Sequence, residues 1–468
     1  MSAAAQLTTP LLKTPEDYDL HDIYPPLDDA QKGKLHEMQG AVETMIAEGV
    51  EFPPSVITGL KRSPALLMTR FLVARQWNVA NAAAMFKASA EFKVKNKFET
   101  TPLFPAACHV RGWDEEELIK FQGVGRREPG ELDKFAETFK GTACSAWHKC
   151  DKDGRPIIID RMGLARPAEI LKRCKALTPP GGKLSHPTLT CHLHRSEVGG
   201  QILQYINREK YVAGQITVII DCTGLTMGHL LGPAMELFKE NTNTDKAYYP
   251  EGTARCYVVN APVIVNAFYA IVKLWLDARM QQKIQFFRPK DTPAKLLEVI
   301  DAESLPSFLG GKCNCEGGCC PEMPKDLPPP EGGTVEVVVP AGRTLRRTSK
   351  VKAGAGVIWS MAITNNDIKF SVVFHPTGPD GQQLPHEHAK VIQDYGRMPA
   401  GETASGDYTA EVDGDVTFVL DNGFSWMKKK TVQFLVKSVD PTGDFDDVEQ
   451  KDETTEGDAP QSPQTPAE

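Results

Sequence analysis

The sequence predicts a multidomain protein: a helical N-terminal module, an α/β domain on a mainly parallel sheet, and an all-β sandwich. Three observations lead to this fold class. Apolar residues recur at helical spacing between Ser63 and Phe92, and continuous apolar runs alternate with helical stretches from Lys140 onward. Beyond a Cys/Gly/Pro-rich stretch, the segments become β-rich. The chain has 468 residues, of which 41% are hydrophobic, which is enough for two or three domains with cores of their own.

The first hundred residues are predicted to be mainly helical. The chain begins irregularly and becomes helical around residues 29–48. Ser63 is a candidate N-cap in front of a proline, and Asn78 restarts the chain for a second helix. The apolar faces of these two helices predict a helical hairpin of about thirty residues, because such faces must be buried against each other.

The central part of the chain carries short apolar runs separated by helical stretches. Runs without alternation suit strands that are buried on both faces, as in a parallel sheet covered by helices. The predicted strands are RPIIIDRMG (155–163), QITVIID (215–221), RCYVVNAP (255–262) and KIQFF (283–287).

The last third of the chain is predicted to be a β-sandwich followed by a tail. Six β-rich segments, from TVEVVVP to TVQFLVKSV, are separated by Gly, Pro, Asn and Asp. Past Asp440 the chain becomes acidic and rich in Pro, Gln and Thr. Such a composition buries too little apolar surface to fold, so we expect a disordered tail.

Composition excludes some classes of function. The net charge of −8 argues against a nucleic-acid binder, which needs an excess of Lys and Arg to pair with phosphates. The N-terminus lacks the pattern of a secretory signal, so the 11 cysteines are expected to be reduced thiols in the cytosol. Asn260, Pro262, Asn266 and Lys273 interrupt the longest apolar stretch, so we expect membrane contact to be peripheral.

Several motifs, taken in order, resemble a known family. The hairpin LLMTRFLVARQWNVANAAAMFKASAEFKVKN looks like the helical N-terminal module of the CRAL-TRIO family. The segments DKDGRPIIIDRMG, ITVIIDCTGL, YYPEGTARCYVVNAP and LPSFLGG resemble hallmark segments of its lipid-binding domain, most closely in the phosphatidylinositol-transfer branch. The segment FVLDNGFSWMKKKTVQFLV resembles part of a GOLD domain, which some CRAL-TRIO proteins append.

The resemblance and the composition together divide the chain into seven parts. These are an N-terminal extension (1–54), the CRAL-TRIO N-terminal helical module (55–100), a connector (101–135), the CRAL-TRIO lipid-binding domain (136–312), a Cys/Gly/Pro-rich linker (313–332), a GOLD-like β-sandwich (333–440) and an acidic disordered tail (441–468).

The resemblance implies a cavity with the sheet as its floor and a helix as its lid, holding one lipid for transfer or presentation. The helix after Pro262 is apolar nearly all round, which fits either an ordinary buried core helix or this lid. A two-chain lipid has roughly thirty methylenes worth about 0.8 kcal/mol each in water, so a carrier must enclose them and open only at a membrane. The expected cavity and gate residues are Ile216, Val218, Val263, Ile264, Phe268, Ile271 and Trp275.

The resemblance also assigns a headgroup site to Arg75, Glu251 and Lys283. Arginine and lysine offset the charge of a phosphodiester, and a carboxylate accepts hydrogen bonds from sugar-like hydroxyls. The alternative is a structural salt bridge between Glu251 and either cation. The sequence departs from the family at Gln76, where a second basic residue is common, and at Met280, where a small hydroxyl residue is common.

The identity of the ligand stays open at this point. Members that also bind phosphatidylcholine place hydroxyls on the strand where this chain has Ile216 and Val218. That difference argues against phosphatidylcholine and favours phosphatidylinositol. It also leaves a sterol or an isoprenoid as an alternative.

Other motifs suggest competing sites. Cys313, Cys315, Cys319 and Cys320 could bind zinc, but their spacing is cramped, so free thiols are the preferred interpretation. The HLHR run (192–195) beside a cysteine lacks an apparent acid partner nearby, and GVG (123–125) lacks the pattern of a phosphate loop. RRTS (346–349) could be a phosphorylation site, but a solvated loop of the β-rich part is the preferred interpretation.

A basic and aromatic run in the β-rich part is a further candidate. Lys428, Lys429 and Lys430 lie beside Phe424, Trp426 and Met427. Such a run fits contact with an anionic membrane or an exposed strand edge guarded by lysines.

The preferred function is therefore a lipid-transfer or lipid-presenting protein that favours phosphatidylinositol and is not an enzyme. We expect a phospholipid ligand, a transient membrane surface and a protein partner of the GOLD-like domain, with no cofactor, no metal and no nucleic acid. The expected location is the cytoplasm, with peripheral attachment to Golgi or endosomal membranes. A vesicle-traffic adaptor is the alternative.

Overall fold

The structure is a computed structural model that describes most of the chain. The described residues are 7, 9–183, 185–225, 229, 233–261, 265, 269, 272–273, 275–324, 335–378, 382–400, 402–439, 445–447 and 450–456.

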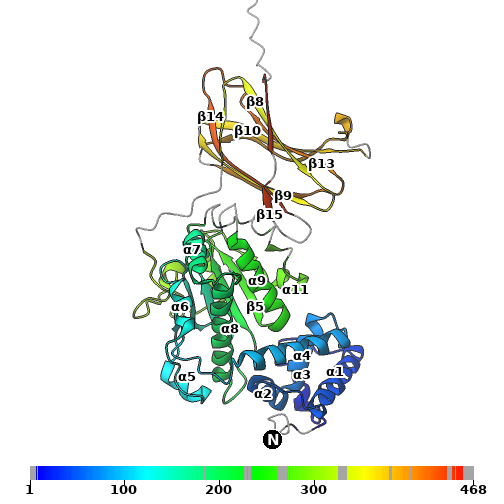
Figure 1. Cartoon of the computed structure of the whole chain (residues 1–468), viewed down its shortest axis with the longest axis vertical. Coiled ribbons are helices and arrows are strands. Elements are labelled where there is room, and N and C mark those ends of the chain that lie inside the picture. The colour runs from blue at the N-terminus through cyan, green and yellow to red at the C-terminus, as the bar shows by residue number, and fades with distance from the viewer. Residues whose placement is uncertain are drawn as a thin grey trace, which may run out of the picture. The chain divides into compact units, whose positions relative to one another are not determined.

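Four helices build the N-terminal module: α1 (Asp29–Ala47), α2 (Pro54–Arg62), α3 (Pro64–Ala74) and α4 (Val79–Asn96) (Figure 1). Capping side chains set where two of them begin, because Asp28 accepts a hydrogen bond from the Gln31 amide and Asn78 accepts one from the Asn81 amide. Ser63 occupies the N-cap position of α3 but does not cap it. Its hydroxyl lies 2.9 Å from Nε2 of His21 instead.

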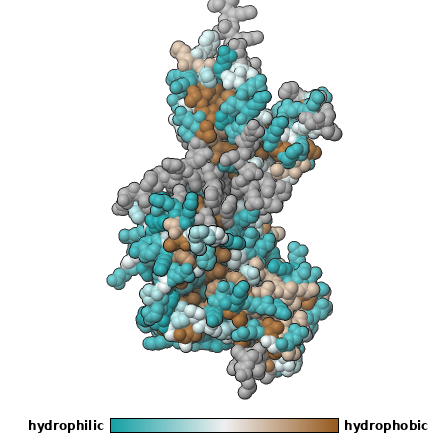
Figure 2. All heavy atoms as spheres, viewed as in Figure 1, coloured by the Kyte–Doolittle hydropathy of each residue, from teal (hydrophilic) through white to brown (hydrophobic). Residues whose placement is uncertain are grey.

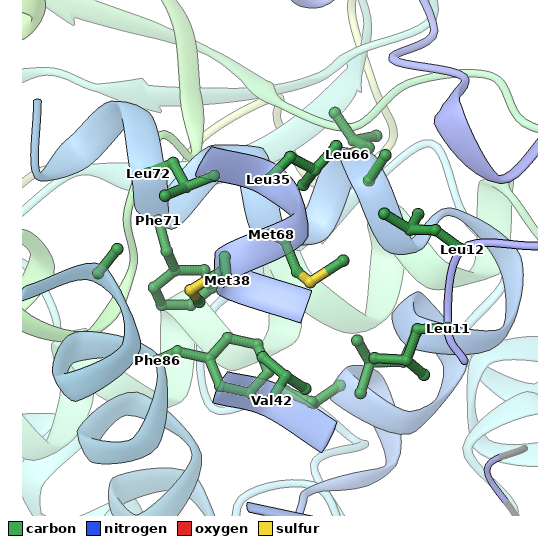
Figure 3. Close-up of a cluster of buried hydrophobic side chains, with 14 of the residues drawn as sticks. Leu11, Leu12, Leu35, Met38, Val42, Leu66, Met68, Phe71, Leu72 and Phe86 are labelled. Atoms are coloured by element: carbon green, nitrogen blue, oxygen red, sulfur yellow. The ribbon is translucent and has the colours of Figure 1, made fainter. Parts of the chain in front are cut away.

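The core of this module draws on the N-terminal extension as well as on the predicted hairpin. Leu11, Leu12, Leu35, Met38 and Val42 pack with side chains of α3 and α4 in one buried cluster (Figure 3). The hairpin therefore does not fold on its apolar faces alone. The extension completes the core by covering apolar surface that two helices cannot bury.

The connector contributes a strand to the sheet. It contains β1 (His109–Arg111), α5 (Glu115–Gln122) and α6 (Glu131–Glu137). β1 pairs in parallel with the next strand along the sheet. This short polar strand has no apolar periodicity, so the sequence did not predict it.

A six-stranded sheet forms the centre of the α/β domain, in the order β1-β2-β3-β4-β5-β6. Every neighbouring pair is parallel except β2 and β3, so the prediction of a mainly parallel sheet is confirmed. All four predicted strands are present. The strands after β1 are β2 (Ser145–Cys150), β3 (Pro156–Asp160), β4 (Ile216–Asp221), β5 (Thr253–Val259) and β6 (Ile284–Phe286).

Helices flank both faces of the sheet. They are α7 (Pro167–Leu177), α8 (His186–Ile206), α9 (Pro233–Tyr248), α11 (Ala278–Lys283) and α12 (Thr292–Val299). On one face, Val198 and Ile202 of α8 pack against Trp147 and Ile158. On the other face, Leu296 of α12 packs in a second cluster with side chains of β3, β4 and β5. Successive side chains of a strand point to opposite faces of the sheet, so each face has a hydrophobic core of its own.

The C-terminal unit is all β, as predicted, and consistent with a GOLD domain. Two antiparallel sheets, ordered β11-β10-β13-β8-β16 and β12-β9-β14-β15 with β7 on β14, share one buried cluster that contains Trp359, Phe370, Phe418 and Phe434. The strands are β7 (Val335–Val339), β8 (Arg343–Val351), β9 (Gly356–Asn365), β10 (Asp367–Pro376), β11 (Lys390–Pro399), β12 (Thr403–Thr409), β13 (Gly414–Asp421), β14 (Lys430–Val439), β15 (Phe445–Asp447) and β16 (Gln450–Glu456).

Strands β15 and β16 lie inside the range that was expected to be a disordered tail. The expectation does not hold for these residues, because cross-strand pairing accommodates their acidic side chains. β16 pairs with β8, and Asp452 accepts two hydrogen bonds of 2.6 Å from the guanidinium of Arg347. An acidic strand is stable beside a strand that supplies arginine.

Candidate functional site

Glu251 lies in the turn between α9 and β5, at the end of the Tyr-Tyr-Pro-Glu motif. Pro250 follows the end of α9, and Glu251 adopts a left-handed backbone with φ of 54°. Its carbonyl accepts a 2.9 Å hydrogen bond from the side chain of Gln215. This turn aims the carboxylate inward, so that only 7% of the Glu251 side chain is exposed.

Two cations hold the Glu251 carboxylate. Lys283 Nζ lies 2.8 Å from Oε2, and Arg279 Nε lies 3.0 Å from Oε1. Lys283 also donates a 2.8 Å hydrogen bond to the carbonyl of Thr253. Arg279 and Lys283 stand one turn apart on α11, so both side chains leave the same face of that helix. The structure thus brings Glu251 and Lys283 together, as the headgroup hypothesis requires, and adds Arg279.

Arg75 does not join this group among the described residues. It stands at the C-terminal end of α3, where its guanidinium donates a 3.1 Å hydrogen bond to the carbonyl of Ala74. The next two residues, Gln76 and Trp77, have left-handed backbones. Arg75 therefore lies where α3 ends and an irregular turn begins. Helical periodicity does not extend into this turn, so it could not predict the direction of the Arg75 side chain.

Tyr24 of the N-terminal extension belongs to the electrostatic surroundings of Glu251, and Arg70 of α3 to those of Tyr24. Burial and then the Glu251 carboxylate raise the pKa of Tyr24, whereas Arg70 and Arg279 act in the opposite direction. Within the described part of the chain, the Tyr24 hydroxyl and the Arg70 Nε are buried and have no hydrogen-bond partner. Buried polar groups usually have one, so these two atoms are exceptions.

The aromatic pair in front of Glu251 docks the helical module. Tyr248 stacks on Phe92 of α4 with ring centroids 3.9 Å apart, and its carbonyl accepts a 2.7 Å hydrogen bond from Ser89. The Tyr249 hydroxyl donates to Glu197 at 2.6 Å. Burial, followed by the charge of Glu197, raises the pKa of Tyr249 well above its usual value, so the phenol remains a donor.

A buried lysine completes this contact. Lys93 Nζ lies 3.3 Å from Glu99 and 3.2 Å from Glu197, so one cation bridges two buried carboxylates. The helical module and the α/β domain are therefore joined through α4, α8 and the turn that carries Glu251. A displacement of α4 would shift the headgroup candidates as well.

The two faces of β4 are not buried to the same degree. Thr217, Ile219 and Asp221 are buried, whereas the side chains that point to the other face are half-buried. These are Ile216, Val218 and Ile220. The prediction of burial on both faces holds for one face of this strand only. The half-buried face is apolar and lies beside the cluster that contains α8.

Comparisons with known proteins identify the α/β part. Residues 140–311 match the CRAL/TRIO domain. The chain carries a CRAL/TRIO domain. "Phosphatidylinositol/phosphatidylcholine transfer protein SFH11" of Arabidopsis thaliana is 35% identical over 175 residues, which covers 37% of this chain and 44% of that protein. "Protein real-time" of Drosophila melanogaster is 30% identical over 277 residues, covering 57% and 36%.

The chain spans less than half the length of each of these two relatives. Among solved structures, the crystal structure of Sfh5 is similar over 66% of this chain and 96% of that chain, with 13% sequence identity and a TM-score of 0.43.

Most of the expected gate of the CRAL/TRIO domain lies outside the described residues. Val263, Ile264, Phe268 and Ile271 fall in that part. Trp275, the remaining gate residue, is buried, as are Val265 and Val272 nearby. Whether this segment moves stays a prediction.

The competing catalytic motif differs from its sequence reading in one respect. His192 does have an acidic partner, because its Nε2 lies 2.8 Å from Asp245, which comes from α9, 53 positions later. Burial raises the pKa of the neighbouring Cys191 thiol to about 12, so the thiolate needed for nucleophilic attack is scarce near neutral pH. The pair therefore suits a contact between α8 and α9.

Two other motifs take regular structural positions. Gly123 ends α5 in a left-handed conformation, so the GVG run forms a helix terminus. The RRTS run belongs to β8, and Ser349 is fully buried. The expectation of a solvated loop for this run is wrong, because hydrogen bonding to β13 and β16 places it inside a sheet.

The basic and aromatic run of the β unit divides into a buried and an exposed part. Lys430 is buried and lies 2.7 Å from Asp367, so it is not part of an exposed basic face. Trp426 and Met427 are 76% and 91% exposed. Figure 2 shows apolar residues at the surface of this unit among hydrophilic ones. Lys428 and Lys429 are exposed beside them.

Proposed function

We propose that this protein encloses one phospholipid and transfers it between membranes or presents it at a membrane, with phosphatidylinositol as the preferred ligand. One observation carries the proposal: a carboxylate and two cations, Glu251, Lys283 and Arg279, cluster inside a CRAL/TRIO domain. A relative of this domain is named as a phosphatidylinositol/phosphatidylcholine transfer protein. The function needs no covalent chemistry, and no catalytic residue is part of the proposal.

The headgroup would bind by exchanging partners within this cluster. A phosphodiester takes the place of the carboxylate at Lys283 and Arg279, because both cations form charge-assisted hydrogen bonds with phosphate. Glu251 then accepts hydrogen bonds from inositol hydroxyls. The Tyr24 hydroxyl, whose pKa the Glu251 charge raises, adds a donor near the carboxylate. Arg75 is proposed on the resemblance alone.

The acyl chains would lie on the half-buried face of β4. Ile216, Val218 and Ile220 offer an apolar surface there. Burial of roughly thirty methylenes at about 0.8 kcal/mol each amounts to about 20 kcal/mol or more. A bound lipid therefore leaves only where a bilayer receives its chains, and we propose residues 263–276 as the segment that opens.

The same strand face favours phosphatidylinositol over phosphatidylcholine. Ile216 and Val218 carry no hydroxyl that could bond a choline phosphate placed near them. An entirely apolar ligand, such as a sterol or an isoprenoid, would also suit this face. With such a ligand, Glu251, Arg279 and Lys283 would bind no headgroup and would only form salt bridges with one another.

The proposed location is the cytoplasm, with peripheral attachment to Golgi or endosomal membranes. Within the part of the chain that the structure describes, no helix has both the length and the apolar character needed to cross a bilayer. Trp426 and Met427, exposed beside Lys428 and Lys429, suit insertion into an anionic interface. The same exposed pair supports an alternative function, that of an adaptor which binds a protein partner through the β unit.

A transfer assay separates the carrier from the adaptor. Donor vesicles contain fluorescent phosphatidylinositol with a quencher, acceptor vesicles are in excess, and the protein is present at a small fraction of the lipid. A carrier moves many lipids per protein molecule. Transfer that stops at one lipid per protein, or that is absent, would favour the adaptor and contradict the proposal.

A further inference from the structure

A second group of polar side chains lies at β2, away from the Glu251 cluster at β5. In the sheet, β3 and β4 lie between these two strands. His148 of β2 meets three cysteines of the segment that follows residue 311: Cys313, Cys315 and Cys319. One potential ligand atom from each residue lies within 4.8 Å of all the others. His148, Cys313 and Cys319 are buried, and Cys315 is half-buried.

The distances among His148, Cys313 and Cys315 match those of a tetrahedral zinc site, and Cys319 Sγ lies within 4.8 Å of all three ligand atoms. Zinc binds sulfur at about 2.3 Å and nitrogen at about 2.0–2.1 Å, which places two sulfurs about 3.8 Å apart and a sulfur and a nitrogen about 3.6 Å apart. The Sγ atoms of Cys313 and Cys315 are 3.6 Å apart. His148 Nε2 lies 3.7 Å from Cys313 Sγ and 3.4 Å from Cys315 Sγ.

We propose that His148, Cys313, Cys315 and Cys319 bind one structural zinc ion. Three thiolates and one imidazole form a closed set of four ligands, with no position left for a substrate. Thiolate ligands favour zinc over magnesium, calcium and manganese. The ion would link the segment after residue 311, which carries the three cysteines, to strand β2, which carries His148.

The set differs from the four cysteines that the sequence suggested. Cys320 does not belong to it, because its sulfur is not among the four potential ligand atoms that lie within 4.8 Å of one another. His148 takes the fourth position although 165 residues separate it from Cys313. The short spacing within C-x-C-x3-C is therefore not an obstacle, since the fourth ligand comes from a distant strand.

The local backbone brings the three cysteines to His148. The amide of Cys313 donates to the Leu305 carbonyl at 3.0 Å, and its own carbonyl accepts from the Ser307 amide at 3.0 Å. Gly317 and Gly318 both have left-handed backbones, with φ of 68° and 83°, which turn the chain back toward the sheet. The Cys315 amide then donates to Cys319 Sγ at 3.4 Å.

Cations near the group offset the charge that three thiolates and one Zn²⁺ would leave. The Lys149 ammonium, which donates a 2.8 Å hydrogen bond to the Glu303 carbonyl, is close enough to Cys313 to interact with its charge. Arg111 donates to the carbonyls of Gly318 at 3.0 Å and Gly317 at 3.4 Å, which holds the turn. Outer groups of this kind orient the ligands of metal sites.

The group is poorly satisfied by hydrogen bonds alone. Among the described residues, Nδ1 of His148 is buried without a partner, and Nε2 faces only thiols, which are weak donors and acceptors. A buried polar group that lacks good partners destabilises a fold.

The test begins with the metal content of the full-length, tag-free chain, purified with a reductant and without added metal. Mass spectrometry of the elements should find about one zinc per chain. Cys319→Ser should lose nearly all of it. Cys320→Ser is the matched control, because this neighbouring buried thiol lies outside the set, and it should keep the zinc.

A second measurement needs no variant. Cobalt(II) exchanged into the wild-type chain should give the intense visible bands and the sulfur-to-metal charge-transfer absorption of a tetrahedral thiolate site. Three results would each overturn the proposal: a chain that stays metal-free after reconstitution with zinc, equal zinc in Cys319→Ser and the wild type, or a disulfide between Cys313 and Cys315 in the protein purified with reductant.

Discussion

Replacing Lys283 by methionine removes one charge from the Glu251 cluster and keeps most of the side-chain volume. The ammonium group loses two contacts of 2.8 Å, one with Glu251 and one with the carbonyl of Thr253. Arg279 stays at 3.0 Å from the carboxylate, so Glu251 keeps one cation. The lysine side chain is only 17% exposed, so solvent replaces these contacts poorly.

The structure sets the size of two separate effects. A hydrogen bond to a charged group contributes about 1.5–3 kcal/mol, and Arg279 compensates in part, so the free energy of unfolding should fall by about 2 kcal/mol. If Lys283 also binds the phosphodiester, the same substitution removes about 2 kcal/mol of lipid affinity, which corresponds to roughly 30-fold. Stability and lipid affinity then fall together.

Lys430→Met is the control, because Lys430 is also largely shielded from solvent, at 4% exposed, and lies 2.7 Å from Asp367 in the β unit. Urea unfolding should show a similar loss for both variants, whereas phosphatidylinositol transfer between vesicles should fall about tenfold or more only in Lys283→Met. Equal transfer by the two variants would refute the headgroup role of Lys283 and leave a salt bridge.

Three further predictions concern docking, membrane contact and pH. Tyr249→Phe removes a hydroxyl 2.6 Å from a buried carboxylate, so urea unfolding should show a loss of about 1–3 kcal/mol; Tyr205→Phe, with an exposed partner, should change stability by less than about 0.5 kcal/mol. Trp426→Ala should weaken sedimentation with anionic vesicles by roughly tenfold without altering the unfolding free energy; unchanged sedimentation would rule out this contact. Burial lowers the pKa of His194 from 6.5 to about 4, so the unfolded chain binds the extra proton and stability falls as pH drops from 6.5 to 4. Over that range His194→Gln should lose about 3 kcal/mol less than wild type, and an unchanged pH profile would show that His194 is not the group responsible; the exposed His388→Gln is the control.

The order of elements could be predicted because it depends on local patterns. Apolar runs of β-branched residues predicted β3, β4 and β5, and the proline and glycine content separated the β unit from the rest. The edge strand β1 was missed, since three residues that include a histidine and an arginine show no strand pattern. β16 was missed because its stability depends on Arg347, which lies 105 positions earlier.

The candidate site was predictable only where the resemblance supplied residues. Glu251 and Lys283 are together, although the sequence alone shows no reason for two residues 32 positions apart to meet. Arg279 could have been found, because it precedes Lys283 by one helical turn and so shares its face. Tyr24 could not, since it comes from an irregular segment whose position depends on the core of the helical module.

The position of Arg75 illustrates a different limit. The family motif predicts that an arginine stands at the end of α3. The direction of its side chain depends on the turn that follows, in which Gln76 and Trp77 have left-handed backbones. Likewise, the cysteine spacing near residue 313 could not reveal His148, because the fourth member of the group is on β2. Contacts between residues far apart in the sequence can be identified only once the fold is known.

The central claim, that the CRAL/TRIO domain holds one phospholipid, is tested most directly by mass spectrometry of lipids extracted from natively purified protein. The account predicts phosphatidylinositol at about one molecule per chain, because the Glu251 cluster suits a phosphodiester with a polyol and the β4 face suits acyl chains. A neutral apolar molecule at the same stoichiometry would contradict the headgroup assignment. The absence of any bound lipid would contradict the carrier itself.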